Sequence, residues 1–235
     1  MSINAFLKIN RSDPSAHLCL RYWLEVFKSY KTYILCDWDN TTSLKTMLID
    51  YPGVEIVSSD RSLVKYCQGL KGAKRNMASA NLTGFNYSKG VEAFWMVDAD
   101  DTMFLTNNFN IINEKLKRAE ELCRSQRIDA FSLDFYRNLN NGWTFGLALI
   151  STAANWQRIQ EVTGDDMASL NFARNIDSAF HVLGLRGILK LRNFVFSGLA
   201  FQHICNNYPE MPHGIYIWNK DRLWDSALQP DVIVI

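Results

Sequence analysis

Three carboxylates follow a short apolar segment, in the sequence Asp98-Ala99-Asp100-Asp101 directly after residues 93–97. An apolar run of this length that ends in acidic residues predicts a buried strand with the carboxylates at its carboxyl end. In an open α/β sheet, ligands bind in the crevice beyond the strand ends. Clustered carboxylate oxygens suit Mg²⁺ or Mn²⁺ better than zinc. The segment therefore predicts a divalent-cation site, and the alternative is a solvated acidic turn that only ends the strand.

A basic segment lies upstream of these carboxylates and carries Lys71, Lys74 and Arg75. The planar guanidinium fork suits phosphate oxygens, and a cation at Asp100 would take the opposite side of the same diphosphate. The segment therefore predicts a phosphate contact, and the alternative is a solvated helix face.

Apolar runs typical of strands alternate with helical patterns along the chain. The predicted strands span residues 5–9, 32–36, 54–57, 93–97, 130–135, 145–151 and 194–201, and the predicted helices 17–29, 43–49, 63–84, 109–125, 156–162 and 176–183. This alternation predicts right-handed crossovers and a largely parallel sheet in an α/β fold. The sequence contains no Pro/Gly-rich hinge, so we expect one domain over residues 1–235 that ends in an irregular wrap from about Cys205.

Composition excludes several classes of protein. A formal net charge of +1 argues against a general nucleic-acid binder, which carries a strong basic excess. Five scattered cysteines without a Cys-x-x-Cys pair argue against a disulfide framework and a zinc ribbon. We expect a cytoplasmic protein, because the sequence shows neither a signal peptide nor an apolar run that could span a bilayer. Trp218 and Trp224 leave peripheral membrane contact open.

Together these segments resemble a family 2 glycosyltransferase of the GT-A fold, which has a Rossmann-like, mostly parallel sheet flanked by helices. The family commonly shows Gly-x-Ala-x-Arg-Asn and then a strand that closes in Asp-x-Asp. Here these parts appear as Gly-Ala-Lys-Arg-Asn at residues 72–76 and Asp-Ala-Asp at 98–100. The resemblance implies that Asp98 meets the ribose or sugar side of a nucleotide donor. It also implies that Asp98 and Asp100 hold the Mn²⁺ or Mg²⁺ that bridges the diphosphate, with Arg75 near the nucleotide.

The ends of the first two predicted strands carry further parts of the family pattern. The family's first strand ends in a Tyr-Asn-Arg-like turn, of which Asn10 and Arg11 remain. Its second strand ends in Asp-Asp-Gly-Ser, of which Asp37 keeps the first aspartate while the following residues differ. The resemblance therefore implies nucleotide contacts from Asn10, Arg11 and Asp37, with Trp38 as a candidate stacking surface for the base.

Residues 105–235 would form the acceptor-binding half, after a nucleotide-binding half over 1–104. The predicted helix that begins at Ile176 resembles the family's Glu-Asp segment, so Asp177 is the implied catalytic base. Without the resemblance, Asp177 would be read as a helix cap. The family often adds a late histidine as a third metal ligand, for which His203 is the first candidate and His213 the second.

These features predict a metal-dependent glycosyltransferase that moves a sugar from a nucleotide diphosphate donor to a hydroxyl of a saccharide or lipid-linked saccharide. We expect a UDP-sugar as donor and a place in polysaccharide biosynthesis. Asp177 would take the acceptor proton as the acceptor oxygen attacks the anomeric carbon with inversion. A retaining reaction, with Asp177 near the sugar, stays open.

Two other classes remain as alternatives. The Asp-x-Asp-x-Thr patterns at residues 37–41 and 98–102 also fit the nucleophile strand of haloacid-dehalogenase-type phosphotransferases. No acidic pair follows Lys190, as that superfamily would require. The second alternative is a catalytically silent GT-A-fold scaffold subunit, which fits the loss of an acid at Ile176.

Overall fold

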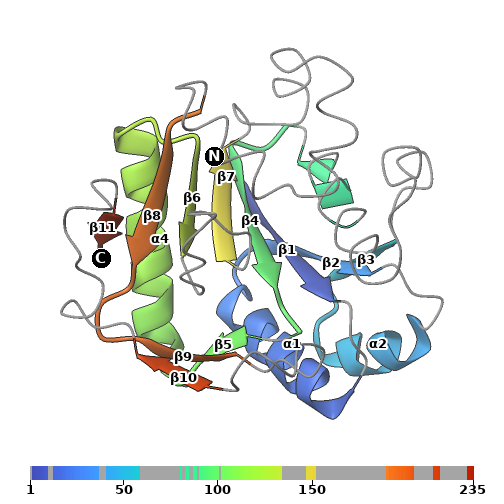
Figure 1. Cartoon of the computed structure of the whole chain (residues 1–235). Coiled ribbons are helices and arrows are strands. Elements are labelled where there is room, and N and C mark those ends of the chain that lie inside the picture. Colours follow the sequence, from blue (N-terminus) through green and yellow to red (C-terminus); the bar gives the residue numbers. More distant parts are fainter. Residues whose placement is uncertain are drawn as a thin grey trace, which may run out of the picture.

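The computed structural model describes residues 2–9, 13–36, 41–58, 80, 83–84, 87–88, 90–100, 102–133, 147–151, 189–203, 214–217 and 232–235. The predicted alternation of strands and helices is confirmed in the first part of the chain (Figure 1). It runs β1 (Ile3–Ile9), α1 (Pro14–Val26), β2 (Lys31–Cys36), α2 (Thr41–Met47) with a 3-10 turn η1 (Leu48–Asp50), and β3 (Glu55–Ser58). The order continues with β4 (Ala93–Asp98), β5 (Thr102–Phe104), α4 (Phe109–Ser125), β6 (Ala130–Leu133), β7 (Leu147–Ser151), β8 (Leu191–Val195), β9 (Ala200–His203), β10 (Gly214–Ile217) and β11 (Val232–Val234). The helices predicted at 156–162 and 176–183, and most of 63–84, lie outside the described residues.

Eight strands form the main sheet in the order β11-β8-β6-β7-β4-β1-β2-β3. All neighbouring pairs are parallel except the two made by β7, which runs antiparallel to β4 and to β6. The protein therefore has an α/β fold with a mostly parallel mixed sheet, as predicted. Because β2 and β3 lie on one side of β1 and β4 on the other, the strand order reverses between β1 and β4.

One face of the main sheet carries the larger part of the core. Ala5 and Leu7 of β1 and Trp95 and Val97 of β4 belong to it, since alternate residues of a strand point to the same face. Helices α1 and α4 contact each other over this face, and the buried side chains of α4 recur at helical spacing, as expected for an amphipathic helix. This packing leaves the alternate residues of β1 and β4 on the opposite face.

Helix α1 begins earlier than the predicted start at residue 17. The Asp13 side chain accepts hydrogen bonds from the backbone N–H groups of Ser15 and Ala16 at 3.1 and 3.2 Å, and Pro14 occupies the first turn. An aspartate cap followed by proline is a strong start signal. The helix therefore starts only a few residues after the end of β1, which brings its amino terminus to the carboxyl edge of the sheet.

The single strand predicted over residues 194–201 is wrong. Strand β8 ends at Val195 and β9 begins at Ala200, and Gly198 between them has a φ of 73°. Glycine adopts this left-handed conformation without the steric cost that other residues meet. The turn lets β8 pair in the main sheet and β9 leave it.

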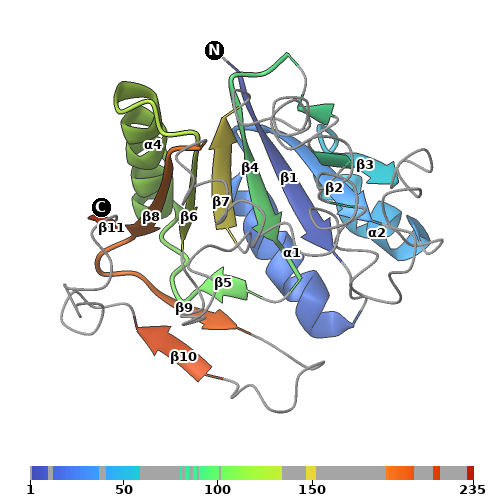
Figure 2. The same ribbon diagram turned by 45° about the horizontal axis from the view of Figure 1, so that its top comes forward.

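A small antiparallel sheet has the order β10-β9-β5 and was not predicted. Figures 1 and 2 both place it beyond the carboxyl end of β4, from which the chain leads directly into β5. The tail after Cys205 was predicted to be irregular, yet it supplies β10 to this sheet and β11 to the edge of the main sheet. Chain segments that are distant in sequence therefore meet beside the acidic motif.

Candidate functional site

The carboxyl ends of β1, β2 and β4 meet at one edge of the main sheet. Ile9 is the Cα partner of Cys36 on β2, and Lys8 is the partner of Asp98 on β4. The strand order reverses between β1 and β4, and this is the position at which open α/β sheets form a ligand crevice. The carboxylates predicted from the sequence therefore lie at the topological switch point.

Lys8 and Asp98 form a buried ion pair at this point. Lys8 Nζ lies 2.6 Å from Asp98 Oδ1; the lysine side chain is 0% exposed and the aspartate side chain 19%. Burying an ammonium ion without a counter-charge costs on the order of several kcal/mol. The carboxylate of Asp98 therefore supplies the charge that makes the buried lysine tolerable, while keeping some contact with solvent.

A backbone hydrogen bond also joins β1 and β4 at the motif. The Ala99 N–H donates to the Lys8 carbonyl oxygen at 2.9 Å, which extends the pairing of β1 and β4 beyond Asp98. Phe6 precedes Lys8 on β1, and Phe94 precedes Asp98 on β4, on the same face of the sheet as the ion pair. Their rings contact edge to face, with centroids 5.5 Å apart. Rigid, packed strands thus hold the first aspartate of the motif in a defined place.

Asp100 lies just past the end of β4 and is 3% exposed. A carboxylate is almost never fully buried without a partner. Its position two residues after Asp98 and two before β5 places it between the main sheet and the small sheet.

The small sheet brings His203 to the acidic motif. In its register His203 is the Cα partner of Thr102 on β5 and of Gly214 on β10. Thr102 is the second residue after Asp100, so the backbone of the first histidine candidate lies beside the motif. The second candidate, His213, lies outside the described residues but directly precedes Gly214. The pairing places the backbone of His203 beside the motif, and the role of its side chain as a metal ligand remains a prediction.

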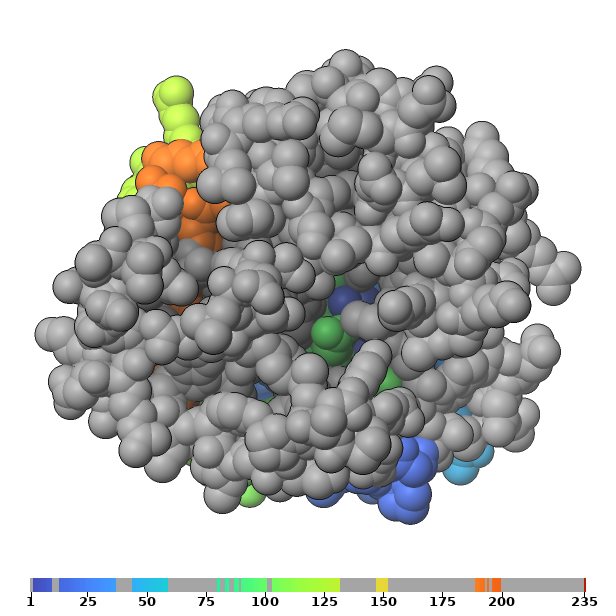
Figure 3. All heavy atoms as spheres, viewed as in Figure 1, coloured from blue at the N-terminus to red at the C-terminus, as the bar shows by residue number. Residues whose placement is uncertain are grey.

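A hollow opens on the face of the molecule seen in Figure 3. Atoms with the colours of β1 and β4 are visible at its floor. This agrees with the register, which puts the polar ends of both strands at a common edge.

The donor set at this edge fits a hard divalent cation in its chemistry. Asp98 and Asp100 offer carboxylate oxygens and His203 an imidazole, a mixture that suits Mn²⁺ or Mg²⁺. Among the side chains that the structure describes, no three from His, Cys, Asp and Glu lie close enough together to form a metal-binding group. The side chain of His203 is not among them.

Five other predicted site residues lie outside the described residues. Asn10 and Arg11 come directly after β1 and Asp37 directly after β2, so their chain positions follow the two strand ends that meet at the site. Arg75 and Asp177 also lie outside the described residues. Their roles remain predictions.

Sequence reasoning missed Lys8. The signal was present, because Lys8 is the one charged residue in the mostly apolar strand at residues 3–9. A charged residue inside a buried strand requires a partner, and the end of β4 carried three candidates. Only the parallel register of β1 and β4 identifies Asp98 as that partner.

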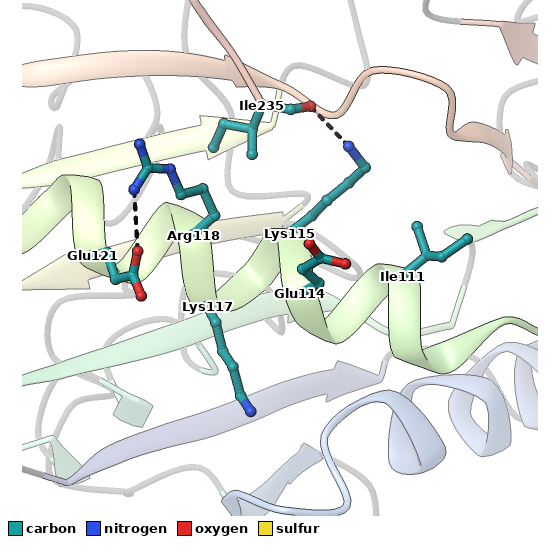
Figure 4. A pocket seen from close by; sticks show the side chains of 7 residues that line it. All are labelled: Ile111, Glu114, Lys115, Lys117, Arg118, Glu121 and Ile235. Carbon is teal, nitrogen blue, oxygen red and sulfur yellow. Dashed lines mark hydrogen bonds and ion pairs between the residues drawn. The ribbon is translucent and has the colours of Figure 1, made fainter.

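Two surface pockets lie away from this site. One is on the outer side of α4, where Lys115 Nζ donates to the Ile235 carbonyl oxygen at 3.0 Å and Arg118 pairs with Glu121 at 3.1 Å (Figure 4). The other lies at the amino ends of β1 and β2, near Glu120. Neither pocket brings reactive groups together as the carboxyl edge does.

Comparison with known proteins adds no family assignment. No protein-family model matches the chain, and no curated protein matches it either. In the described part of the chain, every helix is too short or too polar to cross a membrane.

Proposed function

We propose that the chain is a metal-dependent glycosyltransferase of the GT-A type. Its donor would be a nucleoside diphosphate sugar, a UDP-sugar in the first instance, and its acceptor a hydroxyl of a saccharide or lipid-linked saccharide. The observation that carries the proposal is the position of Asp98 and Asp100, at the carboxyl end of β4 where the strand order reverses. The approach of His203 through the β5–β9 register supports it further.

The chemistry follows from the charges that such a transfer must handle. The acceptor oxygen forms a bond to the anomeric carbon, the bond from that carbon to the phosphate oxygen breaks, and the diphosphate leaves with the electron pair. Asp100 and His203 would hold a Mn²⁺ or Mg²⁺ ion, which neutralises charge on a departing diphosphate when bound. Asp98 would accept hydrogen bonds from donor hydroxyls, and Arg75 and Asp37 would seat the nucleotide.

Asp177 would complete the reaction as the base. A carboxylate takes the proton of the acceptor hydroxyl as its oxygen attacks, and attack from the side opposite the leaving group inverts the anomeric centre. Retention would require Asp177 to lie near the sugar instead. The product stereochemistry, read by NMR, separates these two outcomes.

The test is thermal unfolding with a panel of nucleoside diphosphates and nucleotide sugars, with and without Mn²⁺. A ligand that binds the native state raises the unfolding temperature by mass action. We expect one nucleoside diphosphate family to stabilise the wild type in a Mn²⁺-dependent manner, and Asp100→Ala to abolish the effect. Asp50→Ala is the matched control, because Asp50 is exposed and precedes β3 at the opposite edge of the sheet.

Absence of stabilisation by every nucleotide would contradict the proposed function. A phosphatase assay would then test the haloacid-dehalogenase alternative, in which Asp37 or Asp98 attacks phosphorus. A chain that neither binds nucleotides nor hydrolyses phosphate esters would fit the silent scaffold.

A further inference from the structure

Lys8 contacts the start of the acidic motif through its main chain, at Ala99, and through its side chain, at Asp98. The Lys8 carbonyl accepts from Ala99 N–H at 2.9 Å, while Lys8 Nζ lies 2.6 Å from Asp98 Oδ1. The lysine is fully buried, so water screens its charge only weakly. One residue of β1 therefore places a buried positive charge directly beside the first aspartate of the motif.

The fixed ammonium determines what Asp98 can bind. A divalent cation on the same carboxylate would lie close to a positive charge that cannot move away, and like charges repel strongly where solvent screening is weak. Neutral hydroxyl donors meet no such repulsion at this carboxylate. The ion pair thus favours sugar hydroxyls over a metal at Asp98.

On the basis of the function proposed above, we propose that Lys8 is a positioning residue that reserves Asp98 for the ribose hydroxyls of the donor and leaves the divalent cation to Asp100. The lysine neutralises one of the two carboxylates that an Asp-x-Asp motif offers. The site then binds a cation weakly until the donor diphosphate adds its own negative charge. Metal and nucleotide would therefore bind cooperatively.

Removing the charge of Lys8 should raise the affinity for Mn²⁺ and lower the affinity for UDP. Lys8→Met keeps a long, unbranched side chain of similar volume but removes the positive charge beside the Asp98 carboxylate. We expect Lys8→Met to bind Mn²⁺ several-fold more tightly without nucleotide, and to bind UDP about tenfold more weakly at saturating Mn²⁺. A purely structural role of Lys8 would lower both affinities or neither.

The experiment measures free Mn²⁺ by electron paramagnetic resonance during a titration of the full chain, and UDP binding by calorimetry. Lys31→Met is the matched control, because Lys31 begins β2 at the other end of the sheet and pairs with Glu55 at 3.6 Å, with both side chains 57% exposed. It should match the wild type in both measurements. A Lys8→Met variant that also matches the wild type, or that changes UDP affinity without raising Mn²⁺ affinity, would overturn the proposal.

A double variant, Lys8→Met with Asp98→Asn, covers the case in which Lys8→Met alone does not fold. If Asp98 is not a metal ligand, this variant should bind Mn²⁺ within about twofold of the wild type while losing affinity for UDP. Loss of Mn²⁺ binding in the double variant would show that Asp98 is a ligand and overturn the proposal. A wild-type chain that binds neither Mn²⁺ nor any nucleoside diphosphate would instead contradict the proposed function itself.

Discussion

Trp95 donates its indole Nε1–H to Glu120 Oε1 over 2.7 Å, which joins the centre of β4 to α4. The Tyr30 hydroxyl donates to the same oxygen over 2.9 Å. One half-buried carboxylate oxygen thus serves two donors where the sheet, helix α4 and the segment before β2 converge. This polar junction lies toward the amino ends of the strands, away from Asp98 and Asp100.

Replacing Glu120 should show how much that shared oxygen contributes to the free energy of unfolding. Glu120→Ala leaves both donors without this acceptor, and each unmade hydrogen bond of a buried group costs about 1–3 kcal/mol of unfolding free energy. Glu120→Gln keeps an oxygen in place and should cost distinctly less. Urea unfolding of both variants measures the difference, and equal losses would show that the carboxylate charge matters more than the hydrogen bonds.

The same carboxylate should make stability depend on pH. Burial raises the pKa of Glu120 above its ordinary value of 4.5, although the hydrogen bonds from Trp95 and Tyr30 act in the opposite direction. A raised pKa in the folded state adds stability that is fully present below pH 4.5 and is lost as the pH rises through the folded value. The stability of the wild type relative to Glu120→Gln should therefore fall from pH 4 to pH 8. A difference that rises over this range would contradict the assignment.

The Lys8–Asp98 pair predicts an asymmetry between its two single variants. Asp98→Ala removes the carboxylate that lies 2.6 Å from a buried ammonium ion and should cost about 3–5 kcal/mol. Lys8→Met leaves a carboxylate that is partly exposed and should cost less. The double variant should recover much of the loss, as a double-mutant cycle by urea unfolding would show. Equal, additive losses would mean that the two charges do not interact. Because Asp98→Ala should also destabilise the fold, its activity has to be compared with its stability from this cycle.

Gly198 predicts a local cost that is independent of packing. An added methyl group would meet nothing within 4 Å, so Gly198→Ala carries only the strain of a φ of 73°, about 1–2 kcal/mol. Gly53→Ala is the matched control, because Gly53 is equally open and lacks a positive φ. Calorimetric unfolding should show a loss for the first variant and almost none for the second. Comparable effects would indicate that the turn between β8 and β9 tolerates another conformation.

Asp177 provides the test that separates binding from transfer. Asp177→Ala should leave metal-dependent donor binding intact and reduce sugar transfer by at least about a hundredfold, since the acceptor proton loses its base. Binding is read by calorimetry with the donor nucleotide, and transfer by product formation. Transfer at the wild-type rate would remove Asp177 from the proposed mechanism.

Periodicity predicted the elements whose signals are local. Helix α4 spans Phe109–Ser125 as predicted, because its apolar residues recur at helical spacing along one stripe. The parallel strands β1, β2 and β4 were found because both of their faces are largely buried and read as apolar runs. The position of the acidic motif at the end of β4 followed from the same local pattern.

Features that depend on long-range pairing could not be predicted. β5 is only three residues long and becomes a strand through pairing with β9. The apolar run across Gly198 looks continuous in sequence, although the two halves belong to different sheets. The partner of Lys8 likewise depends on which strand adopts the position beside β1. In each case the deciding contact joins segments that are far apart in the chain.

The β5–β9 pairing also affects the order in which the molecule can be built. Thr102 and His203 are separated by about one hundred residues, and closing a loop of that length costs on the order of 4 kcal/mol in chain entropy. The β1–β2 pairing closes a much shorter segment. The β1–β4 pairing closes a segment of similar length to that of β5–β9, but its large apolar burial offsets the cost, so both pairings of β1 can form first. Folding would therefore complete the acidic edge late, with the main sheet already in place as a template for the small sheet that delivers the histidine.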